Sequence, residues 1–370
     1  MKTWLRNFDL GLYSALTLAL FASNSYAYSG TILFAGSEDV DFTRTGYVEQ
    51  QGSDVNTRNR YTYSRGAMKI GYWSSTSDPP VDYLSTPAFS AQSTVWVHGY
   101  LGSEVGYATT LNAQLVRVLD GSTSRIAVRG TGTSGQLKIS KRNAAGTFTD
   151  LVTTAAGALQ AGVTYPAVID LHVNYSTTGS VTLYINGVSA ATYSGDVTTD
   201  SATTLSQVTI GTYNTSNYTQ WSEVIVGTAD TRSLSLWTIP PVASGTTQQF
   251  LPDTVGNINP FTINDTNLTA TSTNDHLSGW TTSTTPPTGQ WGLVAIVQST
   301  RVARGGTGPQ AFAFYCRSGG TDNVSADQTG ISTSFTNYSA YIWATNCTTA
   351  AAWAIGDITT GFNLGIKARP

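Results

Sequence analysis

Hydrophobic and polar positions alternate most clearly between residues 165 and 195. In an extended chain, Ile169 and Leu171 would lie on one face, and Asp170 and His172 on the other. A period of two residues is typical of a half-buried β-strand, because successive side chains point to opposite faces of a sheet. This segment therefore predicts a strand with one apolar and one polar face.

Two more strands are predicted directly after it. A turn at residues 177–179 leads into the apolar run at 181–185, which ends at Asn186-Gly187. An Asn-Gly pair favours a two-residue hairpin turn, since both residues tolerate positive φ. The stretch as a whole predicts three antiparallel strands joined by tight turns.

These strands carry a family resemblance. The segment "VTLYINGV" at residues 181–188 follows an alternating strand and precedes a short third strand. In this it resembles the laminin-G and concanavalin-like jelly rolls, over about residues 28–237. The resemblance implies a sandwich of two antiparallel sheets, a fold that many unrelated functions share.

Similar patterns recur on both sides of this stretch and amount to about a dozen strand candidates, enough for two sheets. In the run at 93–100, Trp96, His98 and Tyr100 share one face of the predicted strand. Other candidates, bounded by turn residues, are 31–35, 113–119, 124–128, 136–141, 208–211 and 221–226.

Pro240-Pro241 marks the predicted boundary between two domains, because proline cannot continue a hydrogen-bonded ladder. The first domain is predicted over residues 28–238. Residues 239–370 then contain a second set of strand patterns, and their size predicts a smaller C-terminal β-sandwich. Its clearest strands are expected at 291–300, 310–317 and 362–368.

A second resemblance covers residues 222–367. The successive segments "SEVIVGTADTRSLSLWTIPP", "GLVAIVQSTRVARGGTGPQAF", "RSGGTDN", "YIWATN" and "WAIGDITTGFNLGIKA" resemble modular structural proteins of tailed bacteriophages. In that family a concanavalin-like domain precedes this type of C-terminal unit. The resemblance implies a virion protein that contacts other virion proteins and forms a homo-oligomer. Members are assigned mostly by their place in the particle, so their molecular role stays open.

Residues 1–27 have the features of a secretory leader. Lys2 and Arg6 precede an apolar run at 10–22, and Ser25-Tyr26-Ala27 offers small residues for cleavage. The phage family usually lacks a leader, so this segment departs from the pattern. The alternative is a retained, anchoring apolar helix buried against a partner. The run is too short to span a bilayer, and no membrane span is predicted.

Composition supports an all-β protein and narrows its partners. Only 11% of the 370 residues are charged, against about 25% in an average globular protein. Thr, Ser, Gly and Asn replace them, and together with 19 Tyr and 9 Trp they favour sheets and turns. With a net charge of −3 and no basic run longer than Lys141-Arg142, no nucleic-acid partner is expected.

Cys316 and Cys347 are the only two cysteines of the chain. Outside the cytoplasm they could form a disulfide, closing a loop of about 30 residues and adding roughly 3 kcal/mol of stability. Two unpaired thiols are the alternative. The sequence alone does not decide between them.

A glycoside hydrolase on this jelly roll needs two carboxylates that flank the scissile bond, commonly glutamates at alternate positions of one strand. No two glutamates of this chain lie two or four residues apart. The four are Glu38, Glu49, Glu104 and Glu223. The sequence therefore predicts that the protein is not an enzyme, and it predicts no cofactor and no metal.

The best candidate for a ligand site is the polar face of the opening strand. Asp170, His172 and Asn174 point the same way and could ligate a metal or face a sugar, or they could form the solvated face of a surface sheet. His98 has no carboxylate near it in sequence and is interpreted as an ordinary polar residue. Aromatic candidates for stacking on sugar rings are Trp96, Tyr100 and Tyr184.

The leading hypothesis is a non-enzymatic structural protein on the surface of a phage tail or capsid, oligomeric, with host-surface glycans as further partners. The alternative is a secreted bacterial lectin that binds carbohydrate. The lectin would need cleavage of the leader before Tyr28. The state of the N-terminus separates the two hypotheses.

Overall fold

The predicted all-β class is confirmed by a computed structural model. The single helix among the described residues is a 3-10 turn, η4 (Ile355–Ile358), and none of them forms a helix long and apolar enough to cross a membrane. The structure describes residues 10–23, 28–36, 43–44, 63–65, 68–70, 73–74, 81–101, 109–160, 167–213, 220–239, 241–250, 269–282, 291–359 and 361–370.

The chain forms two compact units. The N-terminal sandwich contains the described residues of 28–63 and 70–234, and the C-terminal sandwich contains those of 1–27, 64–69 and 235–370. β4 (Tyr63–Arg65) and β5 (Met68–Ile70) form a separate two-stranded sheet.

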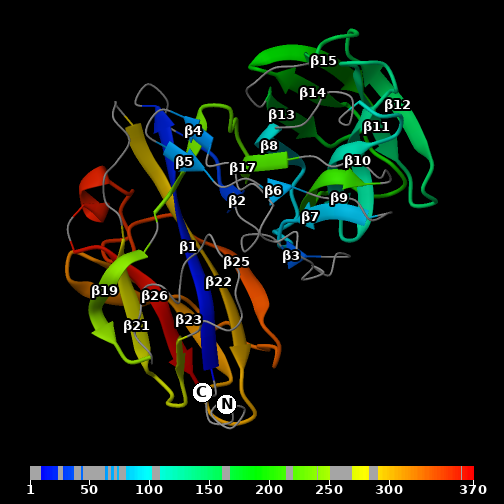
Figure 1. The fold of residues 1–370 in the computed structure, drawn as a ribbon. Coiled ribbons are helices and arrows are strands. Elements are labelled where there is room, and N and C mark those ends of the chain that lie inside the picture. The colour runs from blue at the N-terminus through cyan, green and yellow to red at the C-terminus, as the bar shows by residue number, and fades with distance from the viewer. Residues whose placement is uncertain are drawn as a thin grey trace. The chain divides into compact units, whose positions relative to one another are not determined.

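The N-terminal sandwich consists of two antiparallel sheets of seven described strands each (Figure 1). The first sheet has the order β15-β14-β13-β8-β17-β2, with β6 also paired to β17. Its strands are β2 (Ile32–Gly36), β6 (Trp73–Ser74), β8 (Thr94–Leu101), β13 (Ala167–Asn174), β14 (Gly179–Ile185), β15 (Val188–Gly195) and β17 (Gln220–Gly227).

The second sheet has the order β12-β11-β10-β9-β16-β7-β3. Its strands are β3 (Thr43–Arg44), β7 (Val81–Ser85), β9 (Gln114–Asp120), β10 (Thr123–Gly130), β11 (Leu137–Arg142), β12 (Phe148–Thr153) and β16 (Gln207–Tyr213).

The alternation in the sequence accounts for the first sheet. Leu171 of β13 pairs with Leu183 of β14 and with Val97 of β8, and all three side chains are buried. The predicted hairpin turn is also present, because Asn186 and Gly187 have φ angles of 52° and 79° between β14 and β15. Alternate residues of these strands therefore form an apolar face, and the residues between them form a second, polar face.

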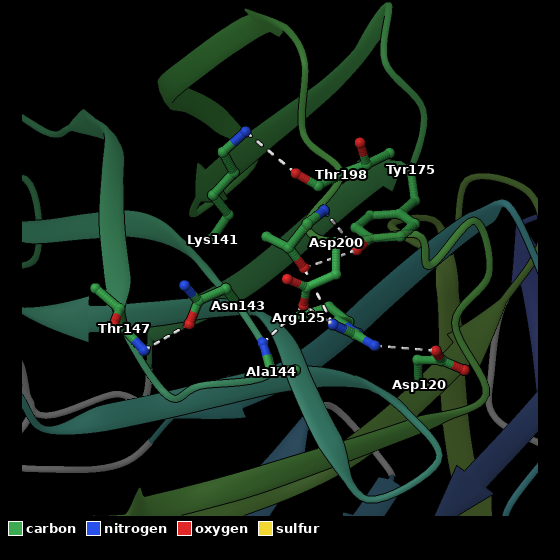
Figure 2. Close-up of polar contacts among 10 residues, drawn as sticks. Asp120, Arg125, Lys141, Asn143, Ala144, Thr147, Tyr175, Thr198 and Asp200 are labelled. Carbon is green, nitrogen blue, oxygen red and sulfur yellow. Dashed lines mark hydrogen bonds and ion pairs between the residues drawn. The ribbon is translucent and has the colours of Figure 1, made fainter.

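A polar cluster holds the loop after β15 to the second sheet (Figure 2). Arg125 of β10 donates a hydrogen bond to Asp200 Oδ2 at 2.8 Å and forms an ion pair with Asp120 at 3.4 Å. Lys141 Nζ donates to the carbonyl oxygen of Thr198 at 3.1 Å, and Ala144 donates its N–H to Asp200 at 2.7 Å. These contacts fix the loop by charge and by hydrogen bonds, in addition to the burial of Val197 and Leu205.

Replacing Arg125 with methionine should destabilise the N-terminal sandwich. The side chain is 9% exposed, and its loss leaves Asp200 and Asp120 without their shared cation. We expect a loss of about 1–3 kcal/mol in the free energy of unfolding, measured by urea denaturation. Arg142→Met is the matched control, because Arg142 bonds the carbonyl of Gly146 in its own turn, and an equal loss in both variants would contradict this role.

The C-terminal sandwich also has two antiparallel sheets. One has the order β18-β1-β22-β25, with β20 paired to β1, and the other has the order β19-β21-β26-β23-β24. The strands are β1 (Leu10–Ser23), β18 (Leu234–Thr238), β19 (Pro241–Gln248), β20 (Thr269–Thr271), β21 (Leu277–Thr282), β22 (Trp291–Arg304), β23 (Ala311–Ser318), β24 (Thr321–Val324), β25 (Thr336–Trp343) and β26 (Asn363–Arg369).

The apolar run of the N-terminal segment is a strand in this structure and not the helix expected for an anchor. β1 pairs with β22 along its whole length, and Figure 1 shows the blue β1 beside the gold β22. The flanking residues 1–9 and 24–27 of the leader-like segment lie outside the described residues. A buried strand in the middle of a sheet has apolar residues on both faces, so it shares the continuous apolar run of a leader.

The core of the C-terminal sandwich is aromatic. Phe312 and Phe314 of β23 pack with rings from other strands, including Tyr338 and Tyr341 of β25. Next to them Cys316 forms a disulfide with Cys347, with the two Cα atoms 6.3 Å apart and a sequence separation of 31. The disulfide ties β23 to the segment that follows β25.

Candidate functional site

Three neighbouring strands of the first sheet bring most of the predicted site residues together. Asp170 of β13 lies opposite His98 of β8 and Tyr184 of β14, and His172 lies opposite Trp96. Directly opposite residues of antiparallel strands share one face of a sheet. We call the face formed by Trp96, His98, Tyr100, Asp170, His172 and Tyr184 the polar face.

The centre of the polar face is a buried pair of ionisable groups. His98 Nδ1 and Asp170 Oδ1 are 2.6 Å apart, and both side chains are 1% exposed. The interpretation of His98 as an ordinary polar residue is thus wrong, because its carboxylate partner comes from a strand 72 residues away. Asp170 is not part of a solvated face either. Sheet pairing supplies a contact that is not visible along the sequence.

Aromatic rings flank this pair. The rings of Trp96 and His172 stack with centroids 4.2 Å apart, and the ring of Tyr184 lies nearly parallel to Trp96 at 6.1 Å. On the other side, Tyr100 meets His98 edge-on at 5.5 Å. Trp96 and Tyr100 are buried, whereas His172 and Tyr184 are partly exposed. The accessible part of the cluster is therefore at His172 and Tyr184.

The loop after β17 contributes a charge pair to the same edge. Arg232 donates from Nε to Asp230 Oδ1 at 2.9 Å and from Nη2 to Asp230 Oδ2 at 2.6 Å. Its Cζ lies 4.2 Å from the centre of the Tyr184 ring and 5.3 Å from that of Trp96. A guanidinium at this distance from an aromatic ring is attracted by the electrons of the ring. Arg232 thus joins the aromatic cluster to the loop.

Protonation of the exposed edge follows from these neighbours. Burial lowers the pKa of His172; Asp230 opposes this effect, and Arg232 adds to it. Burial also disfavours the charge of Asp230, but hydrogen bonds from Arg232 outweigh this cost and hold its pKa below the ordinary value. At neutral pH the edge therefore presents a neutral imidazole beside an ionised Asp230–Arg232 pair.

Several buried polar atoms on and beside the polar face have no hydrogen-bond partner. They are His98 Nε2, Asp170 Oδ2, Ser222 Oγ and Thr231 Oγ1. Ser222 belongs to this face because it pairs with Tyr100, and Thr231 precedes Arg232 in the loop. Buried polar groups in proteins are nearly always hydrogen-bonded, so these atoms are exceptions that gather at the buried centre of the face and in the adjoining loop.

Asn174, the remaining predicted site residue, lies at the end of the polar face. It shares the face of Asp170 and His172 but pairs with Thr94 and Ser180 at the end of β13. Among the described residues, no group of three His, Cys, Asp or Glu side chains is placed to hold a metal ion. The face as described can stack against rings and exchange hydrogen bonds, with His98 and Asp170 hydrogen-bonded to each other at its centre.

Acidification should weaken the N-terminal sandwich through His172. Its pKa is lower when folded than in the unfolded chain, where it is about 6.5. Its contribution to stability is therefore complete above that pH and is lost as the pH falls through the folded pKa. We expect His172→Gln to flatten the loss of stability between about pH 7 and pH 5. Urea midpoints measured across this range check the prediction, with His276→Gln as control, and equal slopes in wild type and His172→Gln would refute it.

The fold and this face define a two-unit β-sandwich protein with an aromatic, partly charged polar face.

No protein-family model and no curated protein matches the chain. Similar solved structures include an endo-β-1,4-glucuronan lyase from the fungus Trichoderma reesei, with 13% identity and a TM-score of 0.33, over 57% of this chain and 94% of that one. The alginate lyase AlyC3 has 12% identity and a TM-score of 0.30, over 60% and 89%. The globular domain of T. cruzi calreticulin has 11% identity and a TM-score of 0.29, over 58% and 89%. At these identities the likeness concerns the β-sandwich fold alone.

One prediction from the sequence is corrected by these structures. The absence of a glutamate pair predicts that the protein is not an enzyme, but two of the similar structures are lyases. The missing pair excludes only hydrolysis by two neighbouring glutamates. The prediction that the protein is not an enzyme, which was based on the missing glutamate pair, is therefore wrong.

Proposed function

We propose that the N-terminal sandwich binds carbohydrate at the exposed edge of its polar face. The observation that carries this proposal is the stack of Tyr184, Trp96 and His172 beside Arg232. Binding sites for small molecules typically combine aromatic or apolar walls with a few well-placed polar groups. A sugar ring matches this combination because it has apolar C–H faces and a rim of hydroxyl groups.

The polar groups around the stack support the same ligand class. Asp230 and Arg232 offer charged acceptors and donors at the edge, and His172 adds a neutral imidazole. Hydroxyl groups both donate and accept hydrogen bonds, so they suit a surface with mixed donors and acceptors. A purely anionic ligand would meet the carboxylate of Asp230 as well as the cation of Arg232.

Binding can be tested by the retardation of the protein in native gels that contain neutral, aminated or uronic acid polysaccharides. We expect retardation by at least one class, and an affinity about tenfold lower for Tyr184→Ala, equivalent to about 1.4 kcal/mol. Tyr193→Ala is the matched control, because Tyr193 pairs with Val181 on the opposite face of the same sheet. Equal binding by both variants would contradict the assignment of the site.

For the setting of this binding, we propose a structural protein on the tail or capsid surface of a tailed phage. The support is the sequence resemblance over residues 222–367 together with the low content of charged residues. Its partners would be other virion proteins and further copies of itself. Mass spectrometry of purified particles tests this proposal. Absence from particles, with a secreted chain that begins at Tyr28, would favour a bacterial lectin instead.

A second candidate function is cleavage of the bound polysaccharide by acid–base chemistry. It is favoured by one observation: His98 is held by Asp170 through Nδ1, while its Nε2 has no partner. A histidine oriented in this way is suited to transfer a proton. Because His98 is only 1% exposed, binding is the better supported function. Release of new chain ends that stops in His98→Gln, while binding persists, would establish cleavage.

A further inference from the structure

β1 occupies an inner position in a sheet whose other long strand comes from the far end of the chain. It lies between β18 and β22, and it pairs with β22 from Leu10↔Arg304 to Ser23↔Trp291. Without β1, both β18 and β22 would present an unpaired edge toward each other. Unpaired edges expose rows of N–H and C=O groups that readily accept another strand.

The side chains of β1 also contribute to the core. Ala19 and Leu20 are fully buried, and Ala22 is 2% exposed. Ala19 lies opposite Ile296 and belongs to the same hydrophobic cluster as Ile296. The contact between β1 and the rest of the unit is therefore both hydrogen-bonded and apolar.

We propose that β18 and β22 form a strand-binding groove, and that its occupant is the chain's own segment Leu10–Ser23, kept in the mature protein. The ligand class is an extended, mostly apolar peptide of about 14 residues that adds its backbone to both strands. The same apolar run that has the features of a leader is thus a structural strand. This inference is independent of the proposed carbohydrate binding.

The groove should hold its strand without a covalent link. To test this in the full chain, a specific protease site is inserted within residues 24–27 and cleaved under native conditions. We expect the N-terminal fragment to elute with the rest of the protein in gel filtration and to separate only in denaturant. Separation under native conditions, with an unchanged melting temperature of the remainder, would overturn the proposal.

Two further arms identify the occupant. A synthetic peptide of residues 10–23 should restore the melting temperature of the denaturant-stripped remainder, whereas the same peptide with Ala19→Asp should not. If the unmodified peptide fails to restore the melting temperature of an otherwise unaltered remainder, the result counts against the groove.

The second experiment asks whether the strand comes from the same chain. If two differently tagged chains are mixed and then cleaved, each N-terminal fragment should stay with the rest of its own chain. N-terminal fragments bound to the rest of the other chain would show exchange between copies and overturn the assignment of the strand to its own chain.

Discussion

Ala19→Asp is expected to unfold the C-terminal sandwich while leaving the N-terminal sandwich folded. Ala19 is fully buried in the aromatic and aliphatic core cluster, opposite Ile296. A carboxylate there would lie among the apolar side chains of this cluster and lose its hydration. Such a change costs about 4 kcal/mol or more, a large part of the stability of a typical domain. Limited proteolysis with mass spectrometry should show new cleavages confined to the segments of the C-terminal unit, residues 1–27, 64–69 and 235–370.

Val242→Asp is the matched control for this substitution. Val242 lies in β19 of the same unit and is 55% exposed, so a carboxylate there remains in water. We expect its free energy of unfolding to stay within about 0.5 kcal/mol of the wild type. If Ala19→Asp resists the protease as well as Val242→Asp does, β1 is not part of the core.

Asp170→Ala should produce the second large loss, in the N-terminal sandwich. The substitution leaves His98 buried without its partner and opens space beside Trp96 and Tyr184. Leaving a buried donor or acceptor without its partner costs about 1–3 kcal/mol, and more where the partner is charged. Asp170→Asn should lose less, because its amide oxygen can still accept the hydrogen bond from His98 Nδ1. The difference between the free energies of unfolding of the two variants, measured by urea denaturation, gives the combined effect of the empty space and the lost hydrogen bond.

Asp196→Ala provides the comparison at the surface. Asp196 is exposed and pairs with Lys141 at 3.5 Å, so its removal should change stability little. A loss in Asp170→Ala no larger than that in Asp196→Ala would mean that the buried pair does not stabilise the sheet.

Local patterns predicted the strands well where one face is buried and the other is polar. The alternation around Asp170 and the Asn186-Gly187 turn specify β13, β14 and their hairpin, and the structure has them. The apolar run of β1 is different, since a leader, a buried helix and a central strand all produce it. Only its pairing with β22, about 280 residues later, distinguishes them, and pairing over such a distance leaves no local signal.

For the candidate site, local patterns likewise predicted which residues share a face of a strand but not which residues meet across strands. The period of two placed Asp170 and His172 on one face, and the same period on β8 aligned Trp96 with His98. The alternation in β8 indicates that His98 shares a face with Trp96. It does not indicate that His98 lies opposite Asp170, because the register between β8 and β13 is set by the pairing of the two strands in the sheet. The Asp230–Arg232 pair lies in a loop, where no periodicity indicates direction.

The chain has three histidines, and this makes one measurement especially direct. His98 and His172 lie on the polar face, whereas His276 is bonded to Thr271 in the other unit and serves as an internal control. NMR spectra of histidine-labelled protein can be recorded during titration with oligosaccharides of the best-binding polysaccharide. Carbohydrate binding at the polar face predicts shifts of the His172 and His98 imidazole signals, with His276 unchanged. Binding that shifts His276 alone, or that moves neither His98 nor His172, would contradict the account.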